Sequence, residues 1–256
     1  MIKNILFWKV EAAGNDFVMV DNRENNFDCS NKGLIAKMCH RRFGIGADGL
    51  IEIFPDKGYD FKMKYYNSDG SGPVMCGNGA RAAVYFAHYR GYLSSEKINF
   101  MAPDGEHLAD MSNKNIRLTI KQPETLELTQ ESEPVYFVDT GTNHIVLKKS
   151  NLYKYNIRAE GAYYRKKYDS NVNFVEEIRQ GEWKIRTWER GVEDETYACG
   201  TGATASAFMI NKIDKINFPI SMFAKGGKLI IDKVYTKLWL EGPTNFVFEG
   251  KWKYKE

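Results

Sequence analysis

A five-residue motif occurs twice in this chain. Cys76-Gly77-Asn78-Gly79-Ala80 returns 123 positions later as Cys199-Gly200-Thr201-Gly202-Ala203, and the offset is close to half of the 256 residues. Each copy leads into small and apolar residues that predict a helix, over 78–89 after the first copy and over 201–212 after the second. The repeat therefore predicts two similar halves, each presenting a thiol at the same local site. Such a pair suits a reaction in which one proton leaves one face of a substrate and another reaches the opposite face.

Strand patterns dominate the rest of the chain. Apolar and polar residues alternate over 61–65, 116–120 and 183–188, as expected of half-buried strands. Further strands are predicted at 5–10, 17–21, 49–54, 98–101, 135–138, 144–148, 173–178, 228–232, 237–240 and 246–248. Two more helices are predicted at 31–42 and near 156–167. We expect an α/β (α+β) fold with an N-terminal half over 1–121, to which the strand within about 244–256 returns, and a C-terminal half over 122–243.

The helices after the two motifs carry little side-chain bulk. Alanine recurs at positions 80, 82, 83 and 87 in the first and at 203, 205 and 207 in the second. An amphipathic surface helix would show a polar stripe. We therefore expect both helices to be enclosed by sheet, with their first turns buried.

Composition narrows the classes of function. A hydrophobic fraction of 43%, a charged fraction of 27% and a net charge of +3 are typical of a globular protein with a real core, and the scattered Lys and Arg residues do not favour a nucleic-acid partner. No apolar run is long enough to cross a membrane or to form a signal peptide. We expect a cytoplasmic protein with reduced thiols. Its cysteines form no CxxC pair and no zinc-site spacing, so no metal is expected: Cys29, Cys39, Cys76 and Cys199.

A thiol just before a helix lies among unpaired backbone N–H groups and at the positive end of the helix dipole, and both favour the thiolate. The glycine-rich turn also lets a carboxylate approach those N–H groups. Removing an α-proton needs a base and stabilisation of the charge that develops on the carboxylate. A single Cys-Gly-x-Gly motif is weak evidence, and a duplicated structural turn remains the alternative. That alternative gives no reason for cysteine in both copies.

Several longer motifs resemble those of the diaminopimelate epimerase family over nearly the whole chain. They are Gly14-Asn15-Asp16-Phe17, Arg42–Gly49, Tyr66–Ser71, Met75–Arg81, Thr140–His144, Asn171–Phe174, Glu189–Thr196, Ala198–Gly202 and Gly242-Pro243. The resemblance implies a cofactor-independent isomerase that converts LL- to meso-diaminopimelate for lysine and peptidoglycan-precursor synthesis. It also implies two pseudo-symmetric halves, each a mostly antiparallel sheet around a central helix, with the active site in the cleft between them.

The resemblance also assigns roles to residues. Cys76 and Cys199 become the catalytic acid/base pair, and His144 and Glu189 are placed to tune the thiols' protonation. Arg190 becomes the partner of the distal carboxylate. The substrate-binding set comprises Asn15, Asn67, Gly77, Asn78, Asn171, Glu189, Arg190, Gly200 and Thr201. The implied partner is the small-molecule substrate, without a nucleic acid or a membrane, and a homodimer is left open.

Each polar residue of this set has a simpler alternative. Asn15 and Asn67 lie in turn-forming contexts, where Asn often bonds only its own backbone. His144 could be a satisfied, half-buried histidine, and Glu189-Arg190 a surface ion pair.

The chain also departs from the family pattern twice. Gly49 stands where the family often has Gln, and Thr142 precedes Asn143-His144 where Asn-Pro-His is frequent. These departures leave the reaction type unchanged and bear on which substrate is bound.

Two other functions stay open at this point. One is a related two-cysteine racemase acting on histidine or a proline derivative. The other is a thiol redox or binding protein without turnover, although cysteines 123 residues apart, each at its own anion-binding turn, argue against it.

Overall fold

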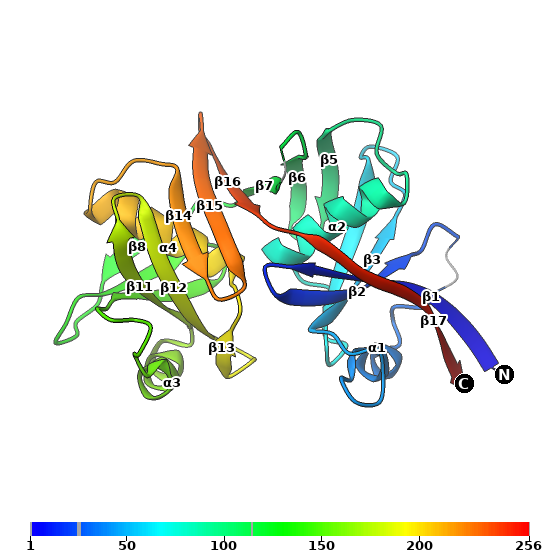
Figure 1. The fold of residues 1–256 in the computed structure, drawn as a ribbon, viewed down its shortest axis with the longest axis horizontal. Helices are drawn as coiled ribbons and strands as arrows, with labels where there is room; N and C mark the ends of the chain where they lie inside the picture. The colour runs from blue at the N-terminus through cyan, green and yellow to red at the C-terminus, as the bar shows by residue number, and fades with distance from the viewer. Residues whose placement is uncertain (1, 25–26, 114, 256) are drawn as a thin grey trace. The chain divides into compact units, whose positions relative to one another are not determined.

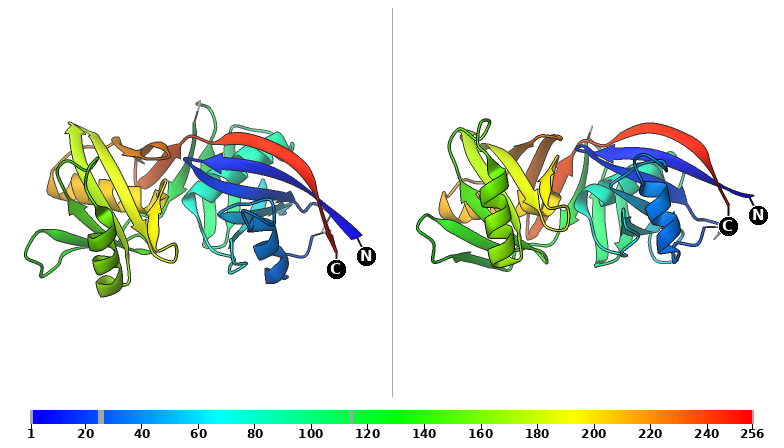
Figure 2. Two further views of the ribbon diagram at one scale, coloured as in Figure 1. Left: turned by 60° about the horizontal axis from the view of Figure 1, so that its bottom comes forward. Right: turned by 90° about the horizontal axis from the view of Figure 1, so that it is seen from below.

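The computed structural model describes residues 2–24, 27–113 and 115–255, which fold into two compact units. One unit comprises residues up to 118 together with those from 244 onward, and the other comprises 119–243. In each unit, strands surround a central helix (Figures 1 and 2). The predicted α/β class is confirmed.

The first unit is built from ten elements. They are β1 (Ile2–Ala12), β2 (Asn15–Asp21), α1 (Lys32–Cys39), β3 (Gly49–Phe54), β4 (Phe61–Asn67), α2 (Gly77–Tyr89), β5 (Lys97–Ala102), β6 (Gly105–Asp110), β7 (Ile116–Ile120), whose last two residues belong to the second unit, and the C-terminal β17 (Asn245–Lys255).

The second unit follows a parallel list. It contains β8 (Thr125–Leu128), β9 (Val135–Asp139), β10 (Asn143–Lys148), α3 (Ile157–Tyr168), β11 (Asn171–Arg179), β12 (Glu182–Glu189), β13 (Asp194–Thr196), α4 (Gly200–Ile213), β14 (Ile220–Ala224), β15 (Gly227–Val234) and β16 (Lys237–Gly242).

The strand pairings repeat between the units. In the first, β1 is antiparallel to β2, β2 is parallel to β3, β3 is antiparallel to β4, and β4 is parallel to β5. In the second, β9, β10, β11, β12 and β14 follow the same sequence of directions. A helix connects each parallel pair, as parallel neighbours require. The duplicated motif is therefore one part of a duplicated fold.

An outer strand completes each unit. β17 lies antiparallel to β1, with Ile5 opposite Trp252, and runs beside it in Figure 2. In the second unit β8 lies antiparallel to β9 in the corresponding place. The first unit thus takes its outer strand from the far end of the chain, whereas the second takes it from its own beginning.

Helix α2 is the centre of the first unit. Ten of its thirteen residues are buried, including Gly77, Asn78 and the whole alanine run. Side chains from β1 to β7 form one apolar cluster around it, for example Phe17, Ile51 and Phe100. Because alanine and glycine leave room for close approach, the strands curl around the helix (Figure 1). The expected enclosure and the buried first turn are confirmed.

Helix α4 has the same place in the second unit. Gly200, Gly202 and the residues from Ala203 to Ala207 are buried, and the helix contacts β9, β10, β11, β14 and β15. Thr201 is half-buried at its first turn. Both central helices therefore begin inside their units and expose only part of the first turn.

Every strand and helix that the sequence predicts is present, with ends shifted by a few residues. The strands β6, β8, β13 and β14 were not predicted. β6 is missed because buried polar residues interrupt its alternation: Asp110 is 2% exposed and accepts hydrogen bonds from Lys97 and Arg117. Those long-range partners offset the cost of burying its carboxylate.

Candidate functional site

The two repeated cysteines cap the two central helices in the same way. Cys76 Sγ accepts the Gly79 N–H at 3.4 Å, and Cys199 Sγ accepts the Gly202 N–H at 3.4 Å. Their backbone dihedrals are also close, φ −140° and ψ 117° against φ −120° and ψ 113°. Both side chains are half-buried. Each sulfur therefore lies at the positive end of a helix dipole and accepts an N–H, which favours a thiolate at either position.

In the first unit a hydrogen-bonded chain positions Asn15 beside Cys76. Asn15 Nδ2 donates to Asp48 Oδ2 at 2.6 Å, so the amide oxygen turns the other way. That oxygen lies 3.8 Å from Cys76 Sγ and 3.5 Å from Asn78 Nδ2. The alternative in which Asn15 bonds only its own backbone is wrong. Asp48, which was not singled out from the sequence, belongs to this candidate site.

Asp48 is itself held by charge. Arg41 bridges it to Asp16, at 2.6 Å and 2.7 Å, and the buried Lys9 lies 2.7 Å from Asp16. Burial raises the pKa of Asp16, but hydrogen bonds from Arg41 and Lys9 outweigh that effect and hold it well below its usual range. The Asp16 carboxylate is thus ionised at neutral pH.

Asn67 keeps its turn chemistry. Its Nδ2 donates to Ser71 Oγ at 3.0 Å, and its carbonyl accepts the Gly70 N–H at 2.9 Å. These contacts stay within one turn, although the Asn67 side chain bonds the Ser71 hydroxyl rather than its own backbone. Its position at the end of β4, at the start of the loop that leads to Cys76, remains compatible with the predicted binding role.

Tyr65 explains the departure at Gly49. A Cβ at Gly49 would lie 2.3 Å from the Tyr65 ring and 2.4 Å from the Tyr66 carbonyl oxygen. Tyr65 is 7% exposed and belongs to the cluster around α2. The space next to Gly49 is thus already filled by an aromatic ring, and no side chain fits there.

In the second unit His144 lies beneath the start of α4. Its Nδ1 lies 3.1 Å from Asn173 Nδ2, and Asn173 Oδ1 accepts the Thr187 hydroxyl at 2.9 Å. The same Asn173 oxygen would lie 2.2 Å from a Cβ at Gly202, so the helix start packs directly on this amide. Asn173 was not singled out from the sequence, although it lies two residues from the predicted Asn171.

His144 is fully buried rather than half-buried. Burial, with a smaller contribution from the charge of Arg190, lowers its pKa to about 3. The imidazole is therefore neutral at pH 7, and its Nε2 has no hydrogen-bond partner within the described residues. Any influence of His144 on a thiol must act through a hydrogen bond rather than through a positive charge.

Asn171 and Arg190 are joined through the backbone. Asn171 Oδ1 accepts the Arg190 N–H at 2.9 Å, and its Nδ2 donates to the Asn143 carbonyl at 3.3 Å. The Arg190 guanidinium reaches the carbonyl and carboxylate of Asp169, at 3.0 Å and 3.1 Å, and its side chain is 38% exposed. Arg190 thus forms an ion pair with Asp169, a residue outside the predicted site. Glu189 lies half-buried at the end of β12.

The other two cysteines differ from the repeated pair. Cys29 and Cys39 are buried, and burial raises the pKa of Cys39 to about 12 and that of Cys29 further. Both thiols are therefore protonated at neutral pH. Cys39 lies on the core side of α1 beside Met38, as expected, while His40 Nδ1 accepts backbone N–H groups.

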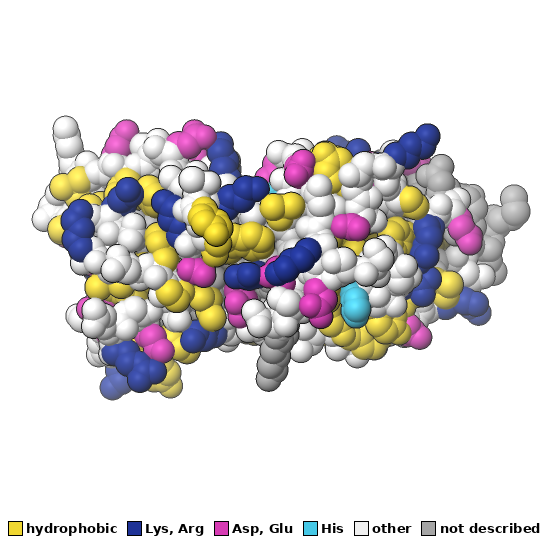
Figure 3. Space-filling view, turned by 90° about the horizontal axis from the view of Figure 1, so that it is seen from above, with side chains coloured by type: hydrophobic (Ala, Val, Ile, Leu, Met, Phe, Trp, Pro, Cys, Tyr) yellow, Lys and Arg dark blue, Asp and Glu magenta, His cyan; other side chains and the backbone are white. Residues whose placement is uncertain are grey.

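Within the described ranges no group of three or more His, Cys, Asp or Glu side chains could hold a metal ion. None of the helices formed by these residues is long and apolar enough to cross a bilayer. On the face in Figure 3, Lys and Arg side chains are interspersed with Asp and Glu in both units.

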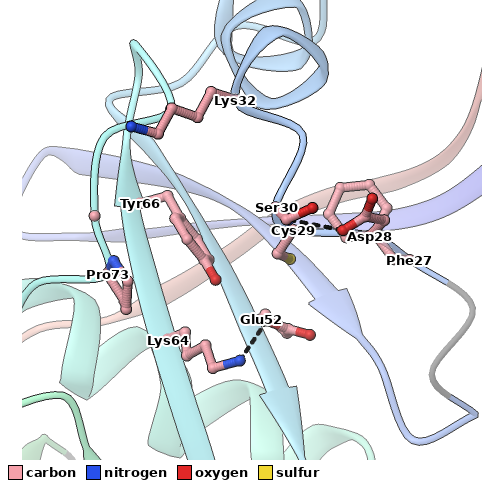
Figure 4. Close-up of a pocket in the computed structure, with 11 residues that line it drawn as sticks. Phe27, Asp28, Cys29, Ser30, Lys32, Glu52, Lys64, Tyr66 and Pro73 are labelled. Carbon is pink, nitrogen blue, oxygen red and sulfur yellow. Dashed lines mark hydrogen bonds and ion pairs between the residues drawn. The ribbon is translucent and has the colours of Figure 1, made fainter.

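A pocket of about 710 Å³ lies on the opposite face of the first unit's sheet. It is lined by Cys29, Glu52, Lys64 and Tyr66 among others (Figure 4). Glu52 belongs to β3, whose Ile51 and Ile53 instead face α2. Lys64 lies 4.0 Å from Glu52, and Glu52 also accepts a hydrogen bond from Asn22. The pocket holds neither repeated thiol, so we do not identify it with the candidate site.

Removing the Asp48 carboxylate is expected to release the Asn15 amide beside Cys76. Asp48→Ala should lower kcat/KM by about tenfold, the scale of one lost charge-assisted hydrogen bond. Steady-state kinetics and thermal unfolding would be measured together. Since Asp48 is 41% exposed, stability should change little.

The matched control is Asp56→Ala. Asp56 lies just beyond the far end of β3 and accepts a turn N–H from Gly58 at 3.1 Å. Equal activity of the two variants would contradict a positioning role for Asp48.

The sequence of this chain is similar to those of known proteins. The family model described as diaminopimelate epimerase matches residues 7–127. The diaminopimelate epimerase of Flavobacterium psychrophilum is 42% identical over 254 residues, covering 94% of this chain and 98% of that protein. The corresponding protein of Chlorobaculum tepidum is 37% identical with the same coverage.

Solved structures show the same fold at much lower identity. A PhzF-family phenazine biosynthesis protein from Bacillus anthracis superposes with a TM-score of 0.77 at 14% identity, covering 99% of this chain and all of that one. A hydroxyproline epimerase from Agrobacterium vitis gives a TM-score of 0.71 at 11% identity, covering 99% and 93%.

Proposed function

Since this chain belongs to the diaminopimelate epimerase family, we propose that Cys76 and Cys199 invert the α-carbon of diaminopimelate, converting the LL to the meso stereoisomer. The observation that carries the proposal is the matched geometry of the two thiols. Each caps a buried central helix with the same 3.4 Å N–H···S contact and the same backbone conformation. A duplicated structural turn would explain the helix starts but not a sulfur at both.

The two proton transfers balance without a cofactor. A thiolate takes the α-proton, so that a C–H bond breaks and an S–H bond forms. The opposite thiol gives up its proton, so that a new C–H bond forms on the other face and the second sulfur becomes the thiolate. Because one proton is shared between two sulfurs, the pair titrates as a coupled unit.

The helix starts serve the reacting end of the substrate. Backbone N–H groups at Gly77-Asn78 and Gly200-Thr201 belong to first turns, where intrahelical partners are lacking. An α-carboxylate held there receives the charge that develops when the α-proton leaves. We call the residues around each repeated cysteine a half-site. Asn15 completes the half-site of Cys76, and the neutral His144 beneath α4 completes that of Cys199.

The distal end of the substrate is assigned to Arg190. A guanidinium binds a carboxylate bidentately, and Asn171 holds the Arg190 backbone in place. Its partner Asp169 is 73% exposed, so a substrate carboxylate can replace it at small cost. Asn67, Asn171 and Glu189 offer further polar contacts to the distal ammonium and carboxylate.

The cellular compartment and the pathway are inferred from the chemistry. Both thiols must stay reduced, which supports a cytoplasmic location. The product serves lysine and peptidoglycan-precursor synthesis. The partner is the small-molecule substrate, and a homodimer remains open.

The test is exchange of the α-proton with solvent. Reduced protein in deuterium oxide, without pyridoxal phosphate, is expected to incorporate deuterium into LL- and meso-diaminopimelate and to interconvert them, as followed by NMR and chiral chromatography. Histidine, proline and hydroxyproline form the comparison panel. No exchange with either diaminopimelate isomer would sink the proposal, and exchange only with a panel amino acid would identify a related racemase.

A further inference from the structure

The two half-sites differ in charge at the residue that directly follows the motif. In the first, position five after the cysteine is Arg81; in the second it is Thr204. Arg81 is completely buried and is the largest fully buried side chain in the described residues. Thr204, also fully buried, donates its hydroxyl to the Gly200 carbonyl at 2.9 Å. The repeat therefore places a cation beneath one thiol and a neutral group beneath the other.

Among the residues that the structure describes, no carboxylate forms an ion pair with Arg81. Its guanidinium donates to Asn78 Oδ1 at 2.7 Å and lies 3.5 Å from the Gly77 carbonyl oxygen, while Nε has no hydrogen-bond partner within the described residues. Burial lowers its pKa to about 10, so it remains charged at neutral pH. A buried charge without a counter-charge is costly. A negative group close to Arg81 would offset that cost.

A thiolate at Cys76 would be such a group. When ionised, Cys76 raises the pKa of the guanidinium, and Glu11 of β1 does so more weakly. Glu11 is half-buried and is engaged by the Gly14 N–H and the Asn245 amide. A hydrogen-bonded path also leads from Arg81 through Asn78 and Asn15 to Cys76 Sγ.

We propose that Arg81 is a positioning residue that keeps the shared proton of the thiol pair on Cys199, so that the resting enzyme carries its thiolate on Cys76. The inference rests on the proposed roles of both thiols, and it adds which of the two sulfurs carries the proton before substrate binds. In the resting state Cys76 is therefore the base. The opposite form, with the thiolate on Cys199, arises only after a turnover.

The remaining groups near each sulfur do not cancel this bias. The Asn15 oxygen, 3.8 Å from Cys76 Sγ, favours the thiol, but this is a long contact to a weak donor, whereas Arg81 carries a full charge in a dry environment. Asp48 behind Asn15 is offset by Arg41. From β4, Tyr65 faces the same helix.

The groups around Cys199 favour its thiolate less strongly than Arg81 favours the thiolate of Cys76. The Thr201 hydroxyl, 3.4 Å from Cys199 Sγ, can donate or accept and so serves either form. His144 is neutral, and Glu189 and Arg190 carry opposite charges, the second paired with Asp169. No fully buried cation corresponds to Arg81 among the described residues of this unit.

The experiment measures the thiolate at each sulfur directly. Reduced, substrate-free protein is alkylated with iodoacetamide across a pH series, and the peptides carrying Cys76 and Cys199 are quantified by mass spectrometry. In the wild-type protein the alkylation midpoint of Cys76 is expected at lower pH than that of Cys199. Arg81→Met should raise the Cys76 midpoint by about one pH unit, which lowers the Cys76 to Cys199 rate ratio at pH 7 about tenfold.

Two variants separate charge from packing. Arg81→Lys keeps the charge but not the fork that reaches Asn78, so the order of the two midpoints should survive. Thr204→Val, at the repeated position, should leave the ratio within about threefold. A folded Arg81→Met with an unchanged Cys76 midpoint would overturn the inference.

The wild-type comparison needs no variant. A Cys199 midpoint at or below that of Cys76 overturns the inference even if Arg81→Met does not fold. Failure here is also distinct from failure of the proposed function. An active epimerase with its thiolate on Cys199 contradicts only the role of Arg81, whereas a low Cys76 midpoint without proton exchange contradicts only the function.

Discussion

Replacing either repeated cysteine by alanine is expected to lower kcat/KM for diaminopimelate by about 10³-fold or more. Each thiol performs one of two obligatory proton transfers, and a positioned acid or base contributes a factor of about 10² to 10⁴. The fold should persist, because Cys76→Ala and Cys199→Ala remove one N–H···S contact at a helix start and leave the helices enclosed. Kinetics in both directions and circular dichroism would measure the two effects separately.

Cys39→Ala is the matched control. Cys39 has the same side chain but lies in the core on α1, and burial raises its pKa to about 12. Its removal should cost about 1 kcal/mol of stability and leave kcat/KM within about twofold. Comparable losses from Cys39→Ala and Cys76→Ala would show that the effect is structural rather than chemical.

Mild oxidation is expected to abolish activity completely and reversibly. If both thiols serve one α-carbon, as proposed, they can form a Cys76–Cys199 disulfide, which removes both the base and the acid. Peptide mapping would identify the bond, and dithiothreitol should restore full activity. The reactive thiols are the half-buried pair, whereas Cys29 and Cys39 are buried and protonated.

A variant with serine at both Cys29 and Cys39 provides the control, since it leaves only the repeated pair to oxidise. It should lose and regain activity as the wild-type protein does. A protein with a verified Cys76–Cys199 bond and undiminished turnover would contradict the two-thiol mechanism.

Much of the fold is readable in the chain because its signals are local. The Cys-Gly-x-Gly-Ala repeat marks both central helices within one residue of their observed starts at Gly77 and Gly200. The strands predicted at 49–54 and 116–120, the second from alternation, match the observed ends of β3 and β7. The alanine content of α2 and α4 predicts their enclosure, since burial without bulk is a property of the residues themselves.

The long-range contacts were not readable. Asn15 meets Asp48 across 33 positions and Cys76 across 61, and no local pattern encodes either pairing. Of the two outer strands, the return of β17 to the first unit was expected, whereas β8, which takes the equivalent place in the second unit, was not predicted.

The sequence by itself therefore determined the duplicated architecture and the family, and it singled out Cys76 and Cys199 as the candidate thiols. The tertiary structure decided their surroundings. It shows that Tyr65 fills the space beside Gly49, that His144 is buried and neutral, and that a fully buried cation, Arg81, follows only one of the two motifs. The physical reason is that solvation and charge depend on neighbours brought together by folding, whereas periodicity and helix starts depend on neighbours along the chain.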